Sequence, residues 1–231
     1  MSPSQRFIAI CERATPRAQV TIYEVVSKKK RKTLPEPEME NLSFNCKEFL
    51  SCAFTPETEK QHLITLSGED DWCIIIWQWD QLKMLARMDL NLVNPPTEME
   101  TFSMSSKKMG QDTVLVVTGS NCFKFYKLEE MMRSIVPVYE NITAAGGDGS
   151  FSEEFTCHEW SMDPIQLVLA TAEGKIVVLN MKGEFQVCVD DSPNRRIDCV
   201  RAYGRGLIFA GTDGMIYPYE ATGTDQLYRP Q

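Results

Sequence analysis

Short apolar stretches separated by small and acidic residues recur along the chain. Each copy has an apolar stretch, a turn, and a second apolar stretch that often contains aromatic residues. The five copies begin at Phe7, His62, Thr113, Gln166 and Gly206. Four of the turns contain a glycine near Asp, Asn or Glu, residues that tolerate the positive φ of tight hairpin connections: Gly68, Gly119, Gly174 and Gly214. The pattern predicts five β-hairpins.

Further short strands are predicted on both sides of these hairpins. Four precede a hairpin, at 48–54, 98–104, 155–161 and 197–203, and three follow one, at 83–90, 135–142 and 184–191. The turn glycines are 51, 55 and 40 residues apart, close to the ~40 to 50 residues of one propeller blade. Four strands per repeat are also typical of propeller blades. The chain is therefore predicted to be all-β, a WD-repeat-like β-propeller that is incomplete, with about four to five four-stranded blades.

The predicted blades span approximately 1–35, 46–92, 97–140, 154–191 and 196–229. The innermost strand of the first blade is missing before Phe7, so we expect a fragment or an incomplete gene product. Unpaired strand edges would then be open to further blades from the same or another chain. Two segments, 27–45 and 144–150, are expected to be flexible insertions at blade edges.

Composition narrows the possible partners. The chain has 231 residues, of which 43% are hydrophobic and 24% charged, as in ordinary globular proteins. Its net charge of -8 argues against nucleic-acid binding, which needs a surplus of cations. Neither a membrane span of ~18 to 20 apolar residues nor a secretory segment is apparent. We therefore expect a soluble cytosolic protein without a membrane partner, whose eight cysteines are reduced core thiols.

No motif predicts catalysis, a cofactor or a metal. His62 and His158 belong to different repeats and lack metal-ligand spacing. The glycine-rich stretch 146–150 precedes a strand and lacks the lysine of a phosphate-binding loop, so a linker is favoured. A propeller hydrolase with its site in a central channel is an alternative. The scarcity of histidine argues against it, and we expect a protein that is not an enzyme.

Two features are candidate protein-interaction sites. The first is the only concentrated basic run, and it follows the second predicted strand: Lys28, Lys29, Lys30, Arg31 and Lys32. It is either a solvated loop or an electrostatic contact for an acidic surface such as a microtubule. The second is Trp72, in a turn of the tryptophan-rich repeat WCIIIWQWD, which is either packed in the core or exposed for binding.

Two stretches carry a resemblance to a known family. The stretch 73–80, CIIIWQWD, is similar to the end of a WD-repeat third strand, and SPSQRFIAICE from Ser2 is similar to the opening of a second strand, although the usual Gly-His dipeptide is missing. With 47–83 and 119–130, they resemble the early blades of the axonemal WD-repeat proteins of cilia and flagella. The resemblance implies tandem propellers followed by a coiled coil, which this sequence does not contain.

The family resemblance also implies a function and partners. It implies a scaffold in the cytoplasm and the axoneme that supports assembly or anchoring of inner dynein arms and regulatory complexes. The implied partners are subunits of those complexes and proteins of the doublet microtubules. The alternative is a general cytosolic WD-repeat adaptor, which would use its surface in the same way outside the axoneme.

Overall fold

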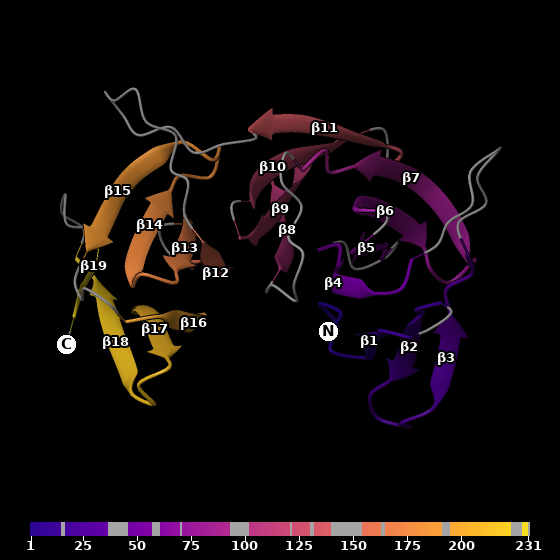
Figure 1. Cartoon of the computed structure of the whole chain (residues 1–231), viewed down its shortest axis with the longest axis horizontal. Helices are drawn as coiled ribbons and strands as arrows, with labels where there is room; N and C mark the ends of the chain where they lie inside the picture. Colours follow the sequence, from indigo (N-terminus) through magenta and orange to yellow (C-terminus); the bar gives the residue numbers. More distant parts are fainter. Residues whose placement is uncertain are drawn as a thin grey trace. The chain divides into compact units, whose positions relative to one another are not determined.

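The described part of the chain is built from β-strands (Figure 1). The computed structural model describes residues 1–14, 17–36, 46–56, 61–69, 71–92, 102–120, 122–129, 132–139, 154–162, 165–190, 195–222 and 228–230. Within those ranges there is no helix, and so none that could cross a membrane. The segments 37–45 and 144–150, expected to be flexible insertions, lie outside them.

The strands form five sheets in which sequence neighbours are sheet neighbours. The first two sheets contain β1 (Phe7–Cys11), β2 (Val20–Glu24) and β3 (Lys30–Thr33), then β4 (Phe49–Phe54), β5 (Leu63–Ser67), β6 (Cys73–Gln78) and β7 (Lys83–Asp89). The third contains β8 (Ser103–Met109), β9 (Asp112–Gly119), β10 (Cys122–Glu129) and β11 (Ser134–Tyr139). The last two contain β12 (Phe155–Trp160), β13 (Leu167–Thr171), β14 (Lys175–Leu179) and β15 (Phe185–Asp190), then β16 (Ile197–Tyr203), β17 (Gly206–Gly211), β18 (Ile216–Ala221) and β19 (Tyr228–Pro230).

This succession of three- and four-stranded meanders confirms the predicted all-β propeller class. The chain divides into two compact units. The first comprises Met1–Thr97, Met104–Val116 and Tyr126–Val138, and the second comprises Glu98–Ser103, Val117–Phe125 and Tyr139–Gln231. The third sheet contributes strands to both units, whereas the other four sheets each belong to one.

The core of the first unit lies between its first two sheets. Strands β5 and β6 are buried on both faces, and that is why they are almost continuous apolar runs instead of alternating ones. Val20 and Ile22 of β2 pack in one cluster with Leu63 and Trp77. Each such side chain, fully withdrawn from water, contributes about 1.5–3 kcal/mol to folding. This cluster anchors the first sheet, which carries the basic run.

The second unit has an equivalent core between the sheets β12–β15 and β16–β19. Val168 and Val178 from the first of these sheets pack with Val200 and Phe209 from the second. Phe209 and Tyr219 meet edge to face, with ring centroids 5.1 Å apart. Apolar side chains on facing sheets therefore hold successive sheets together in both units.

Strand β19 at Tyr228–Pro230 was not predicted from the sequence. Two further strands differ from the prediction. The strand expected at 98–104 is found at Ser103–Met109, and 98–101 lie outside the described residues. The segment 27–45, expected to be a loop, contains strand β3 at Lys30–Thr33. Both strands are rich in polar residues, and backbone pairing with the neighbouring strand defines them instead of an apolar pattern.

Candidate functional site

The basic run lies on the hairpin formed by β2 and β3. Lys28 and Lys29 belong to its turn, where Lys28 has a φ of 55° and the Glu24 N–H donates to the Lys29 carbonyl at 2.9 Å. Lys30, Arg31 and Lys32 belong to β3 itself. Two residues of the basic run therefore lie in the turn and three in the edge strand β3.

Glu24 fixes the shape of this hairpin. Its carboxylate accepts hydrogen bonds from Ser27 Oγ at 2.6 Å and from Arg6 Nε at 3.0 Å, and it also binds the guanidinium of Arg31. These hydrogen bonds, with Ser27 contributing most, lower the pKa of Glu24 to about 2. The carboxylate is thus charged at any physiological pH. We call the four residues Arg6, Glu24, Ser27 and Arg31 the Glu24 clamp.

The β2–β3 pairing explains how the clamp assembles. Phe7 of β1 is opposite Glu24 of β2, and this register places Arg6 beside the carboxylate. Between β2 and β3 the register skips Arg31, because Tyr23 pairs with Lys30 and Ile22 with Lys32. A bulge of this kind changes the direction of a side chain, and the Arg31 guanidinium reaches Glu24. Sequence reasoning missed Glu24, although an acidic residue just before a basic run was a visible signal.

The remaining four cations of the run are available at the surface. Lys28, Lys29 and Lys30 are exposed and Lys32 is half-buried. Within the described ranges, none of the four has an ion-pair partner. Beside them, Val26 is 88% exposed at the tip of the turn. The hairpin therefore presents a mixed cationic and apolar tip.

Trp72 is where the sequence placed it, in the turn between β5 and β6. It has a φ of 33°, and its N–H donates to the Gly68 carbonyl at 2.9 Å. The side chain is half-buried, whereas Trp77 and Trp79 of the same repeat belong to the core. Both Trp72 and the basic run lie in the first unit.

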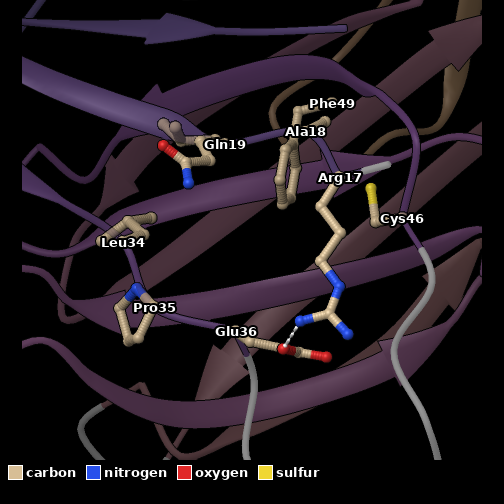
Figure 2. Close-up of a pocket in the computed structure, with 9 residues that line it drawn as sticks. Arg17, Ala18, Gln19, Leu34, Pro35, Glu36, Cys46 and Phe49 are labelled. Carbon is tan, nitrogen blue, oxygen red and sulfur yellow. Dashed lines mark hydrogen bonds and ion pairs between the residues drawn. The ribbon is translucent and has the colours of Figure 1, made fainter. Parts of the chain in front are cut away.

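A pocket of about 210 Å³ opens beside β2 (Figure 2). Leu34, Cys46 and Phe49 line its apolar part, and Figure 2 shows Arg17 and Glu36 paired at its edge. Burial raises the pKa of the Cys46 thiol to about 12, so this sulfur stays protonated and is a poor nucleophile. The pocket is smaller than the ~300–1,000 Å³ typical of ligand sites. The carboxylate in its described lining, Glu36, is paired with Arg17.

Polar side chains also meet where one sheet packs on the next. In the second unit, Thr118 Oγ1 and His158 Nδ1 lie 2.8 Å apart, and both side chains are buried. Burial lowers the pKa of His158 to about 3, so the imidazole is neutral at physiological pH. A neutral, enclosed histidine bonded to a hydroxyl is a structural element of the core. His62 belongs to the first unit and is far from His158 in the sequence.

The first unit has a matching position occupied by two cysteines. Cys11 of β1 and Cys52 of β4 interact through their thiols, and this interaction together with burial raises the pKa of Cys11. The Cys52 thiol also donates to the Ala9 carbonyl at 3.8 Å. The match follows from the backbone bridges between Arg13 and Glu48 and between Ser120 and Glu154. Cys11 lies two residues before Arg13, as Thr118 does before Ser120. Cys52 lies four residues after Glu48, as His158 does after Glu154.

A metal site needs several ligand side chains close together. In the described residues, no group of three or more His, Cys, Asp or Glu side chains is arranged to hold a metal ion. Some ion pairs in this part of the chain connect successive sheets, such as Arg201 of β16 with Glu159 of β12 at 3.2 Å. The β2–β3 hairpin is therefore the strongest candidate for a functional surface.

Comparison with known proteins shows which proteins this sequence is similar to. No family model matches the chain. It is 27% identical over 201 residues, 85% of its length, to cilia- and flagella-associated protein 57 of Mus musculus. It is also 22% identical over 278 residues, covering 96% of the chain, to cilia- and flagella-associated protein 57 C of Tetrahymena thermophila. Its sequence is similar to cilia- and flagella-associated protein 57. The chain spans 14% of the mouse protein and 21% of the Tetrahymena protein.

Solved structures agree on the fold. The β-propeller domain of Cps50 (Swd1) from Myceliophteria thermophila superposes with a TM-score of 0.66 at 11% identity, covering 100% of this chain and 68% of that one. The WD40 repeats of RRP9 superpose with a TM-score of 0.64 at 11% identity, covering 100% of this chain and 63% of that one. At such low identity the likeness concerns architecture alone. The WD-repeat propeller fold is thereby established.

Proposed function

We propose that this chain is a non-enzymatic WD-repeat scaffold of motile cilia and flagella. The observation that carries the proposal is the similarity to cilia- and flagella-associated protein 57 over 85% of the chain in one relative and 96% in another. In this role the chain supports the assembly or anchoring of inner dynein arms and regulatory complexes on the axoneme. Its partners are the subunits of those complexes and proteins of the doublet microtubules.

The architecture suits a scaffold for a physical reason. The central strands β5 and β13 are fully buried and β6 is buried except for its last residue, so they hold the sheets in a fixed geometry. Fixed sheets present their connecting hairpins as rigid surface features, and binding specificity then resides in surface side chains. The Glu24 clamp extends this rigidity to the cationic tip, which is our candidate contact for an acidic partner.

Localisation and loss of function together test the proposal. A fluorescently tagged copy is expected to concentrate along the axoneme and to remain with it after detergent removes the ciliary membrane. Deleting the gene is expected to reduce inner dynein arm subunits in isolated axonemes, measured by quantitative mass spectrometry. A tagged copy that stays in the cell body, or a deletion that leaves axonemal dynein unchanged, would contradict the axonemal role.

The second candidate function is a general cytosolic WD-repeat adaptor. It is favoured by the fold alone, because the same architecture is shared with structures only 11% identical to this chain. The localisation experiment separates the two, since an adaptor outside the axoneme gives diffuse fluorescence in the cell body and is washed away by the detergent step.

A further inference from the structure

Four lysines of the β2–β3 hairpin form a positive patch on an otherwise acidic chain. The chain has 32 acidic and 24 basic residues, so carboxylates are abundant. Even so, in the part of the chain that the structure describes, none pairs with Lys28, Lys29, Lys30 or Lys32. Like charges at such close spacing repel one another. An anionic partner that relieves this repulsion gains free energy on binding.

The Glu24 clamp prepares the patch for binding. The carboxylate of Glu24 engages both Arg6 and Arg31, so these two cations are partly neutralised while the lysines remain available. Ser27 is tied to the same carboxylate, which fixes the turn that carries Lys28 and Lys29. A binding surface ordered before the encounter loses less entropy when the partner arrives.

The chemistry of the patch favours a flexible acidic peptide over larger polyanions. Lysine ammonium groups are compact point charges on flexible stems, so they pair with carboxylates in many orientations, which suits an unfolded partner. A membrane or a nucleic acid would bring its negative field close to the rest of a chain with a net charge of -8. A flexible tail can contact the hairpin without approaching the rest of the chain. The exposed Val26 adds an apolar contact for the aliphatic side-chain atoms of such a tail.

We propose that the β2–β3 hairpin binds a glutamate-rich, unfolded protein tail through Lys28, Lys29, Lys30 and Lys32. This contact rests on the proposed scaffold function and names the kind of partner that the scaffold holds. Association through exposed charges is steered over a distance and weakens as salt screens the field. The contact therefore gives a fast, reversible attachment to an acidic protein surface.

A different explanation of the same lysines makes its own prediction. β3 is an edge strand of the first sheet, and lysines on edge strands prevent unwanted pairing with other chains. If edge protection were their only role, replacing them by glutamine would promote aggregation and leave peptide binding unaltered. Peptide affinity and the state of association must therefore be measured on the same variants.

The test uses fluorescence anisotropy of a fluorescein-labelled oligoglutamate peptide titrated with the chain. The quadruple variant Lys28→Gln, Lys29→Gln, Lys30→Gln and Lys32→Gln is expected to lose roughly tenfold or more in affinity, since each exposed ion pair contributes modestly and four are removed. The matched control changes four lysines outside the hairpin, Lys83, Lys107, Lys108 and Lys182, to glutamine and keeps full affinity. Circular dichroism and size-exclusion chromatography confirm that both variants are folded and unassociated.

Several results would overturn the proposal. Equal loss of affinity in the two quadruple variants would mean that only net charge matters. Unaltered affinity in the hairpin variant, or stronger binding to phosphatidylserine vesicles or duplex RNA than to oligoglutamate, would also reject it. Localisation separates this failure from failure of the scaffold role. A tagged chain that reaches the axoneme without binding oligoglutamate refutes the hairpin contact alone, and one that binds the peptide but stays out of cilia refutes the scaffold.

Discussion

Acid sensitivity of the second unit is expected to depend on His158. The side chain is 5% exposed and its Nδ1 lies 2.8 Å from Thr118 Oγ1. Burial lowers its pKa from 6.5 to about 3, because the charged form would lose its hydration. In the unfolded chain the imidazole has its ordinary pKa of ~6.5. The unfolded state therefore binds the proton more readily than the folded state.

The sign and size of the effect follow from proton linkage. Above pH 6.5 the imidazole is neutral in both states and has no influence on pH dependence. As the pH falls from 6.5 toward about 3, the unfolded state gains a proton that the folded state does not, and stability is lost. At ~1.4 kcal/mol per pH unit, lowering the pH from 8 to 5 removes about 2 kcal/mol of unfolding free energy through this one group.

Urea unfolding at pH 8 and pH 5 measures this loss in three proteins: the parent chain, His158→Gln and His62→Gln. Glutamine does not titrate but can still hydrogen-bond to Thr118. The parent and His158→Gln share all other ionisable groups, so those contributions cancel between these two proteins. We expect the parent to lose about 2 kcal/mol more than His158→Gln on acidification. Equal losses in all three proteins would refute the assignment to His158. Hydrogen exchange in β12 and β13 then locates the change in the second unit.

Two further predictions concern stability. Thr65→Val removes the acceptor of the 2.9 Å hydrogen bond from Trp77 Nε1 and leaves a buried N–H without it, so urea unfolding should show a loss of about 1–3 kcal/mol. The same change in a Trp77→Phe background should cost much less, and additive losses would contradict this explanation. Gly206→Ala places a Cβ 1.9 Å from the Tyr219 carbonyl oxygen. This overlap should lower the free energy of unfolding by about 1–3 kcal/mol. The control Gly204→Ala, with no atom within 4 Å of its Cβ, should unfold at nearly the parent urea concentration.

The sequence predicted those strands whose side chains are apolar and buried. The apolar runs of β5 and β6 and the hairpin turn between them follow from burial on both faces and from the acidic turn residues. β3 and β8 were missed or misplaced because KRKT and SMSSKKM carry little apolar signal. Pairing with a neighbouring strand stabilises them, and that information lies outside their own residues.

The candidate site shows the same division. The lysines were visible as a run, but their arrangement depends on Glu24, whose partners Arg6 and Arg31 are separated in sequence and brought together by strand register. The contact between Thr118 and His158 spans 40 residues and depends on the packing of successive sheets. Contacts between repeats are therefore the part of the site that local patterns cannot reveal.

The matched positions between sheets have a consequence for how such chains change over time. A thiol pair occupies one junction, Cys11 with Cys52, and a hydroxyl and an imidazole occupy the other, Thr118 with His158. The backbone geometry recurs at the two junctions, whereas the side chains that fill it differ. Substitutions at these positions should therefore be tolerated in pairs, so that a change on one sheet is accompanied by a compensating change on the next sheet.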